Sequence, residues 1–375
     1  YITKSLIKPI IADGFVRDPS LPNTPTFIEL AKNAEQKKIF ELVAISSTFG
    51  RSFFYPAGVP ADRIKIMRDA FSEQLYKEAL KDKRIYIVVA DISPAGSMLK
   101  FRQKFPDRFI NVGVSEQSMI GIAAGLAMKG KRVFTYTIAT FSLYRPFEMI
   151  RDNFCYQNLP VTVVGMGAGT IYNNLGGTHM SQEDIAICRS VPNFNVISPS
   201  DPAEMKEAVS YCVKNKKKNT IYLRLGKSGE KNFTQNAIEK WKFAKIRKIQ
   251  NGKRICIISH GILMKISFDL SNSLKNKKLI PSIYSSHTIK PFDTKTFKKI
   301  CDKYEIIVSI EDHSQIGGLG SILREEAFLN KYKGQLINYS LKDKFINDYG
   351  SQVSLLKKHG ISKEKILKKI YKIIK

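Results

Sequence analysis

The chain of 375 residues lacks any long apolar run, since no stretch of 18 consecutive apolar residues occurs in it. A transmembrane helix needs about 20 mainly apolar residues, so no membrane span is expected. The first residues, YITKSLIKPIIADGF, have neither a long apolar core nor a small-residue cleavage site, which predicts that they are not a secretory signal. Apolar residues form 43% of the chain, and its length is enough for two or three domains.

Acidic residues are scarce: 33 Asp and Glu stand against 61 Lys and Arg, which gives a formal net charge of +28. Such an excess is typical of proteins that bind nucleic acids. Here, however, the lysines are spread over the whole second half, without interleaved aromatic residues or a nucleic-acid motif. We therefore interpret the charge as lysine on solvated faces, expect no nucleic-acid partner, and expect the surface to attract small anionic substrates.

Cysteine and histidine are also rare, with five of each, and neither type clusters. No two cysteines form a CxxC pair, and most of them lie inside apolar runs, which predicts buried free thiols and a reducing, cytoplasmic location. The scattered histidines predict that no His/Cys metal site exists in this chain.

Short apolar runs alternate with helical stretches from about residue 84 onward. Strands are predicted at 85–90, 132–137, 161–166, 194–198 and 220–225, and helices at 116–129, 143–156, 182–189 and 202–214. Asp201 and Pro202 form a good helix start, an N-cap followed by proline at the first helical position. Buried strands that alternate with helices indicate a mostly parallel sheet covered on both faces.

A second series of the same kind follows a polar, lysine-rich stretch. Its predicted strands are 254–259, 279–285 and 305–311, and its predicted helices are 261–276, 293–302 and one from about 318. The predicted fold class is therefore α/β, with two doubly wound, mostly parallel-sheet domains. The predicted division is an N-terminal appendage at 1–66, a first domain at 67–230, a linker at 231–250 with at most one short strand, and a second domain at 251–375.

The segment NVGVSEQSMIGIAAGLA, residues 111–127, places the carboxylate of Glu116 at the entry of an apolar helix rich in small residues. A carboxylate in that place is partly removed from water and can hold or share a proton. A cofactor ring nitrogen needs such a partner from a protein.

Several ordered motifs extend this signal along the chain. They are ADISPAG (90–96), NVGVSEQ (111–117), ATFSLYRPFEMIRDNF (139–154), GGTHMSQED (176–184), SPSDPAEM (198–205), YLRLGKSGE (222–230), HTIKPFD (287–293) and EDHSQIGGLGS (311–321). In order and spacing they resemble the C-terminal half of transketolases, a pyrimidine-binding domain followed by a transketolase C-terminal domain. The resemblance covers about four-fifths of the chain and implies a thiamine-diphosphate-dependent transferase that moves a two-carbon ketol unit between sugar phosphates or related ketoses.

The resemblance also implies roles for individual residues. Glu116 matches the glutamate that hydrogen-bonds N1′ of the aminopyrimidine, and Phe141 matches the phenylalanine that stacks on that ring. His179 matches a histidine that contacts the substrate and takes part in catalysis, and Arg224 matches a phosphate-binding arginine. Asp91 lies at the end of the first strand, where open α/β sheets bind ligands, and a turn role for it stays equally open.

The chain departs from the family pattern at three expected substrate contacts and at one aromatic position. Gly167 replaces the second substrate histidine, Leu175 replaces an aspartate, and Ala95 replaces a phosphate-binding serine. Ile138 stands where a second aromatic residue is common. A site without these partners discriminates less between sugar phosphates, so donor and acceptor stay open.

The GDG motif that holds Mg²⁺ and the diphosphate in this superfamily occurs nowhere in the sequence. The resemblance therefore implies a split transketolase. This chain would be the C-terminal subunit without metal ligands of its own, and a separate N-terminal subunit would hold most of the Mg²⁺ and diphosphate site in an α2β2 assembly.

Three other interpretations remain. The fold also suits the beta subunit of a 2-oxoacid decarboxylase or dehydrogenase, although HTIKPFD and EDHSQIGGLGS favour the transketolase branch. Residues 1–66 resemble the C-terminal end of periplasmic receptors of tripartite tricarboxylate transporters, which suggests a solute-binding protein or a nonfunctional fusion.

His287 and His313 are interpreted as structural hydrogen-bonders, and the C-terminal ISKEKILKKIYKIIK as an amphipathic helix docked by its Ile/Leu face.

Overall fold

The computed structural model divides into two compact units, Tyr1–Pro60 and Ala61–Lys375. The described residues are 25–26, 28–38, 41, 66–92, 97–215, 219–226, 232–348 and 350–374. In the first unit they include the 3-10 helix η2 (Ile28–Leu30) and helical residues 34–38. Most of the appendage predicted at 1–66 lies outside the described residues, and the predicted domain limits stay predictions.

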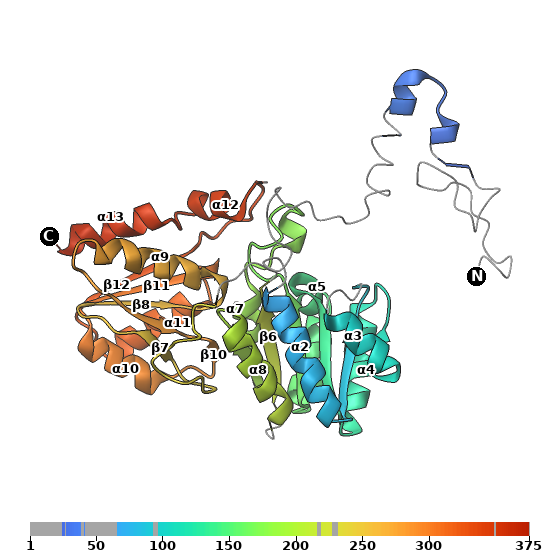
Figure 1. Ribbon diagram of the computed structural model, residues 1–375, viewed down its shortest axis with the longest axis horizontal. Coiled ribbons are helices and arrows are strands. Elements are labelled where there is room, and N and C mark those ends of the chain that lie inside the picture. The colour runs from blue at the N-terminus through green and yellow to red at the C-terminus, as the bar shows by residue number, and fades with distance from the viewer. Residues whose placement is uncertain are drawn as a thin grey trace. The chain divides into compact units, whose positions relative to one another are not determined.

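The second unit contains two sheets, and the first of them has seven strands (Figure 1). The strands, in chain order, are β1 (Ile85–Val89), β2 (Phe109–Asn111), β3 (Arg132–Ile138), β4 (Val161–Met166), β5 (Phe194–Ile197), β6 (Thr220–Leu225) and β10 (Thr288–Lys290). Their spatial order is β10-β5-β6-β4-β3-β1-β2, and every neighbouring pair is parallel except β10 with β5.

Helices cover both faces of this sheet. They are α2 (Ile66–Lys81), α3 (Ser97–Lys104), η4 (Pro106–Arg108), α4 (Glu116–Met128), α5 (Ala139–Leu143), α6 (Phe147–Met149), the π-helix η5 (Ile150–Tyr156), η6 (Gly177–His179), α7 (Asp184–Ser190) and α8 (Pro202–Lys214). Helices α2, α3 and α8 pack on one face, and α4, η5 and α7 pack on the other. Because both faces are buried, a strand such as β1 reads as a continuous apolar run in the sequence.

The second sheet has five strands in the order β12-β11-β8-β9-β7. Its strands are β7 (Arg247–Gln250), β8 (Ile255–Ser259), β9 (Ser282–Ser285), β11 (Ile306–Ser314) and β12 (Gln335–Leu341). Its helices are η7 (Gly261–Leu263), α9 (Met264–Lys275), α10 (Thr294–Lys303), α11 (Leu319–Leu329), α12 (Gln352–Lys358) and α13 (Lys363–Ile374). Ile366 and Ile370 of α13 are fully buried against this sheet's core, which confirms the predicted docking of the C-terminal helix.

The predicted fold class is confirmed, and each predicted strand is present within a few residues. The helix predicted at 143–156 begins too early, because α5 ends at Leu143 and helical structure resumes at Phe147 in α6 and continues in η5 to Tyr156. Pro146 lies between α5 and α6, and its ring cannot fit an unbroken helix. The predicted N-cap is confirmed, since the Asp201 side chain accepts a hydrogen bond of 2.9 Å from the backbone N–H of Glu204.

The cysteines are free thiols, as predicted; four are buried and Cys301 is half-buried. No helix of the described part is long and apolar enough to cross a bilayer. His313 is buried, and one of its ring nitrogens accepts from the backbone N–H of Ala186 at 3.3 Å, in keeping with a structural role.

His287 is the second buried histidine with a structural environment. Its ring is fully buried, stacks on Trp241 at a centroid distance of 4.8 Å, and lies 3.0 Å from Oγ1 of Thr288. Burial lowers the pKa of His287 to about 3, and the nearby Arg247 cation acts in the same direction. The imidazole is therefore neutral in the folded protein at neutral and mildly acidic pH.

We expect His287 to make the protein less stable in mild acid. In the unfolded chain its pKa returns to about 6.5, so the unfolded state binds the proton first as the pH falls. From about pH 6.5 downward this residue should remove up to about 1.4 kcal/mol from the free energy of unfolding per pH unit. Urea unfolding at pH 7, 6 and 5, followed by Trp241 fluorescence, should show a shallower pH slope for His287→Gln than for the parent. Equal slopes would contradict this assignment.

Candidate active site

The carboxyl ends of the parallel strands in the first sheet lie at one edge, and four of the five predicted site residues follow those ends. Asp91 comes directly after β1, and the segment after β2 leads into Glu116. Phe141 lies in α5 after β3, and His179 lies in η6 after β4. Open parallel sheets bind ligands at this edge, so the topology gathers these residues from four segments.

Glu116 is the first residue of α4 and is only 4% exposed. The helix is held in place because Met119, Ile120 and Ala123 pack against the sheet. The positive end of the helix dipole favours a negative charge at this position. The carboxylate is thus removed from water at the N-terminal end of a helix.

Arg145 is the partner of Glu116, and sequence reasoning did not single it out. Its Nη1 lies 2.9 Å from Oε2 of Glu116, while 55% of the arginine side chain is exposed and 5% of the glutamate side chain is exposed. The arginine Cζ also lies 5.7 Å from the ring centroid of Phe141. In the sequence, Arg145 is marked only by its place four residues after Phe141 in the ATFSLYRPF motif. That place alone does not distinguish it from an ordinary surface arginine.

Phe141 and His179 are in contact with each other. Their ring centroids are 5.1 Å apart with an interplanar angle of 74°, an edge-to-face arrangement. Tyr172 lies edge-on to His179 at 6.3 Å, and Oγ1 of Thr178 lies 3.0 Å from the histidine Nδ1. The structure therefore brings Glu116, Phe141 and His179 into one cluster, with Arg145 between the first two.

Asp91 lies at the same edge and is exposed. Its backbone adopts a positive φ of 45°, and its N–H donates to Oδ1 of Asn111 at 3.3 Å. The same oxygen accepts from the backbone N–H of Gly113 at 3.0 Å, which ties the loop after β1 to the loop that leads into α4. These contacts suit the turn role of Asp91; its cofactor role stays a prediction.

Gly167 has a structural reason to be glycine. Its φ is +66°, and a Cβ at this position would collide with the ring of Tyr172. The space that a second substrate histidine would need is therefore filled by the tyrosine. Leu175, at the aspartate position, is 44% exposed, and Ala95 lies outside the described residues.

Arg224 is buried, with 4% of its side chain exposed. Its Nε donates to Oδ2 of Asp184 at 2.8 Å, and its Nη2 donates to the backbone carbonyl of Asp312 at 2.8 Å. Tyr222 also donates to Oδ2 of Asp184, at 2.7 Å. Burial raises the pKa of Asp184, but the Arg224 cation and these hydrogen bonds outweigh it and hold that pKa below its usual value. These contacts favour a structural role for Arg224, and its phosphate-binding role stays a prediction.

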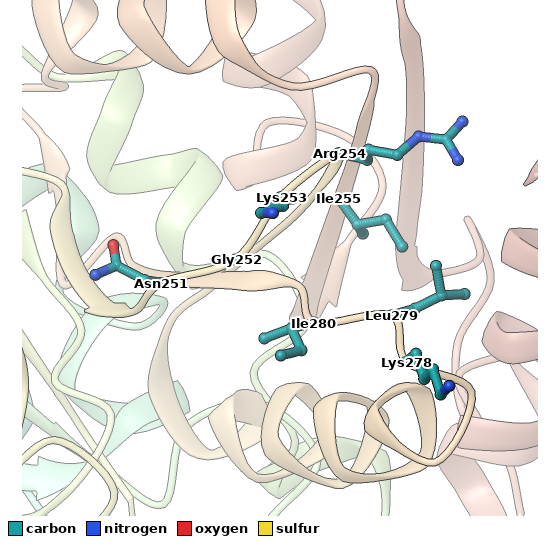
Figure 2. Close-up of a pocket in the computed structure, with 8 residues that line it drawn as sticks. All are labelled: Asn251, Gly252, Lys253, Arg254, Ile255, Lys278, Leu279 and Ile280. Atoms are coloured by element: carbon teal, nitrogen blue, oxygen red, sulfur yellow. The ribbon is translucent and has the colours of Figure 1, made fainter.

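Metal-ligating side chains and one further pocket were compared with the candidate site in the described part of the chain. No cluster of three or more His, Cys, Asp or Glu side chains suited to a metal ion occurs among the described residues. Figure 2 shows a pocket lined by residues 251–255 and 278–280, where apolar walls meet lysine and arginine side chains. It lies at the amino end of β8 in the second sheet, and its eight lining residues include no candidate site residue.

Comparison with family models and with individual known proteins points in both cases to transketolases. Two family models match, the transketolase pyrimidine-binding domain over residues 65–230 and the transketolase C-terminal domain over residues 244–366. A transketolase C-terminal section of Methanocaldococcus jannaschii is 33% identical over 83% of this chain and 97% of its own length. An apulose-4-phosphate transketolase subunit of Phocaeicola vulgatus is 27% identical over 84% of this chain and 99% of its own length.

A solved structure of a split-gene transketolase, an inactive beta4 tetramer, covers 82% of this chain and 97% of its own chain with a TM-score of 0.71 at 27% identity. The two α/β domains and the relatives identify the fold as that of thiamine-diphosphate-dependent transferases. The chain belongs to the transketolase family. Within that family it corresponds to the C-terminal section, a subunit of a split transketolase-like transferase.

The buried pair of Arg224 and Asp184 yields a test of the structural role. Arg224→Met should lower the free energy of unfolding by about 3–5 kcal/mol, because it leaves a buried carboxylate without its cation. The double variant Arg224→Met with Asp184→Leu should recover much of that loss, since it removes both charges. Urea denaturation measures both values.

Arg84 offers a matched control, because it pairs with Asp82 at 2.8 Å while 59% of its side chain is exposed. Arg84→Met should cost no more than about 1 kcal/mol. A loss for Arg224→Met as small as that of the control would show that the buried pair is not what stabilises this region.

Proposed function

We propose that this chain supplies the pyrimidine half of a thiamine diphosphate site and catalyses ketol transfer together with a separate N-terminal subunit. The observation that carries the proposal is the cluster at the sheet edge. A buried carboxylate, Glu116, begins α4, and the aromatic ring of Phe141 lies close by, with a flat cation next to both.

The described residues fit the pyrimidine part of the cofactor. The guanidinium of Arg145 is a planar hydrogen-bond donor that already lies against both Glu116 and Phe141. A flat ring with a nitrogen that faces the Glu116 carboxylate can make the same two contacts, a hydrogen bond to Glu116 and packing on Phe141. The diphosphate and Mg²⁺ have no such fit here, because the described part contains no suited cluster of ligands and the sequence contains no GDG.

Each side chain of the cluster has a role in this proposal. When bound, thiamine diphosphate supplies the electron sink that makes transfer of a two-carbon ketol unit possible. Glu116 shares a proton with the ring nitrogen N1′ through a hydrogen bond, and Phe141 orients the ring by stacking. His179, in edge contact with Phe141, donates to a substrate hydroxyl.

The split-gene relatives and the absence of a GDG motif from the sequence support a partner subunit. We propose that an N-terminal subunit holds Mg²⁺ and the diphosphate, and that the two chains form an α2β2 assembly. The related split-gene chain that is inactive as a beta4 tetramer supports a need for such a partner. The buried free thiols support a cytoplasmic location.

The substrates belong to the sugar phosphates or related ketoses. The relative from Phocaeicola vulgatus is named for apulose-4-phosphate, which supports a phosphorylated sugar as the class. The net charge of +28 favours anionic substrates. The relatives named as transketolase sections and subunits favour ketol transfer over 2-oxoacid chemistry. The two family models match residues 65–230 and 244–366, which favours an enzyme over a solute-binding protein.

Glu116 provides the test of this proposal. The chain should be co-expressed with an N-terminal transketolase subunit and assayed for thiamine-diphosphate-dependent ketol transfer between sugar phosphates. Glu116→Gln keeps the shape of the side chain but cannot take up the proton, so kcat should fall by about 10²- to 10⁴-fold.

Glu148 is a suitable control, because it is an exposed carboxylate on the nearby helix α6. Glu148→Gln should retain the parent activity. If Glu116→Gln is as active as the parent, the assignment of the active site is wrong. Turnover of a 2-oxoacid without turnover of any ketose phosphate would replace ketol transfer by the alternative chemistry.

A further inference from the structure

We propose that Arg145 is a displaceable side chain, which occupies the place of the cofactor's pyrimidine ring until that ring binds. The inference rests on the proposed function, because it takes Glu116 and Phe141 as the two contacts of the ring. It assigns to Arg145 a positioning role in cofactor loading, in which it competes with the ring for Glu116.

The position of the guanidinium is the first argument. Arg145 donates from Nη1 to Oε2 of Glu116 at 2.9 Å, and its Cζ lies 5.7 Å from the centroid of the Phe141 ring. One side chain thus touches both of the groups that would hold the ring. A pyrimidine that bonds to Oε2 of the carboxylate and stacks on the phenylalanine would therefore compete with the guanidinium for both contacts.

The chemistry of the guanidinium is the second argument. It is planar and delocalised, donates hydrogen bonds to carboxylates in its own plane, and packs well on aromatic faces. An aminopyrimidine protonated at its ring nitrogen shares each of these properties. The arginine therefore imitates the cofactor ring toward Glu116 and Phe141.

Burial explains why such a substitute is useful. The side chain of Glu116 is 5% exposed, and a buried carboxylate without a partner is costly. The side chain of Arg145 is 55% exposed, so it can leave this contact for water at little cost. The Arg224–Asp184 pair differs, because both of its members are at most 4% exposed and neither has water to move into.

The backbone around Arg145 also permits the movement. Helix α5 ends at Leu143 and α6 begins at Phe147, so Arg145 lies between two helices. Its side chain is 55% exposed, so rotation about its side-chain torsions can carry the guanidinium into water. Arg151 has a similarly exposed side chain, but it lies in the π-helix η5 and pairs with Asp152.

Competition of this kind has a thermodynamic signature. A contact that stabilises only the cofactor-free state must weaken cofactor binding by the same free energy. Removal of Arg145 should therefore lower the stability of the cofactor-free protein and tighten cofactor binding together. An arginine that stays in place beside the bound ring would have the opposite effect on affinity.

The experiment measures the affinity for thiamine diphosphate, with Mg²⁺ present, by isothermal titration of the chain assembled with its N-terminal subunit. Arg145→Met should bind the cofactor about three- to tenfold more tightly than the parent. The melting temperature of this variant should be lower than that of the parent without cofactor, and the difference should shrink at saturating cofactor. Arg151→Met, the matched control, should change neither value.

A double variant shows whether the effect passes through the carboxylate. In the Glu116→Ala background, Arg145→Met should no longer tighten cofactor binding, because the carboxylate for which the arginine and the ring compete is absent. Should Arg145→Met fail to assemble, Arg145→Lys keeps the charge without the planar fork and should bind the cofactor about two- to fivefold more tightly than the parent.

The possible results separate this inference from the proposed function. If the parent assembly binds the cofactor and Arg145→Met binds it equally or more weakly, the inference is overturned and the proposed function stands. If the parent assembly binds no thiamine diphosphate, the proposed function fails and the inference fails with it. Tighter binding that persists in the Glu116→Ala background would also overturn the inference.

Discussion

The ion pair of Arg224 and Asp184 is the interaction on which the arrangement of the second unit depends. It connects β6 to α7 inside the first sheet's layer, and the arginine also donates to the backbone carbonyl of Asp312 in β11 of the second sheet. The carboxylate of Asp312 in turn accepts from the N–H and Oγ1 of Thr170, at 3.0 Å each. The loop between β4 and His179 is thus fixed by the second domain. A charged cluster with so little exposure tolerates few alternative arrangements.

The two arginines of this region illustrate how burial separates structural from functional charge. Arg224 is enclosed and has bonds on both sides of the domain contact, so its position is set by the fold. Arg145 bonds to an equally buried carboxylate but keeps more than half of its own side chain in water. The same residue type, paired with the same kind of partner, is fixed in one place and exchangeable in the other.

Most of the fold could be predicted from the sequence, because strands buried on both faces appear as apolar runs and helices begin at recognisable caps. Glu116 could be predicted because the residues that define its helix are its neighbours in sequence. Arg145 could not, because its partner lies 29 positions away and an isolated exposed arginine has no distinctive pattern.

Gly167 looked like a lost histidine, whereas the structure shows that the ring of Tyr172 needs the space. The strand β10 was missed because it has three residues and pairs antiparallel across the domain boundary.

That strand has a consequence for how the chain reaches its native state. β10 comes from the C-terminal part of the chain, yet it covers the outer edge of the first sheet beside β5. During synthesis the strands β1 to β6 leave the ribosome before β10 does, so the edge of β5 stays open until Lys290 has emerged. An uncovered strand edge is a template for pairing with other chains. The first domain is therefore most exposed to aggregation in the interval before its last strand arrives, and completion of the second domain protects the first.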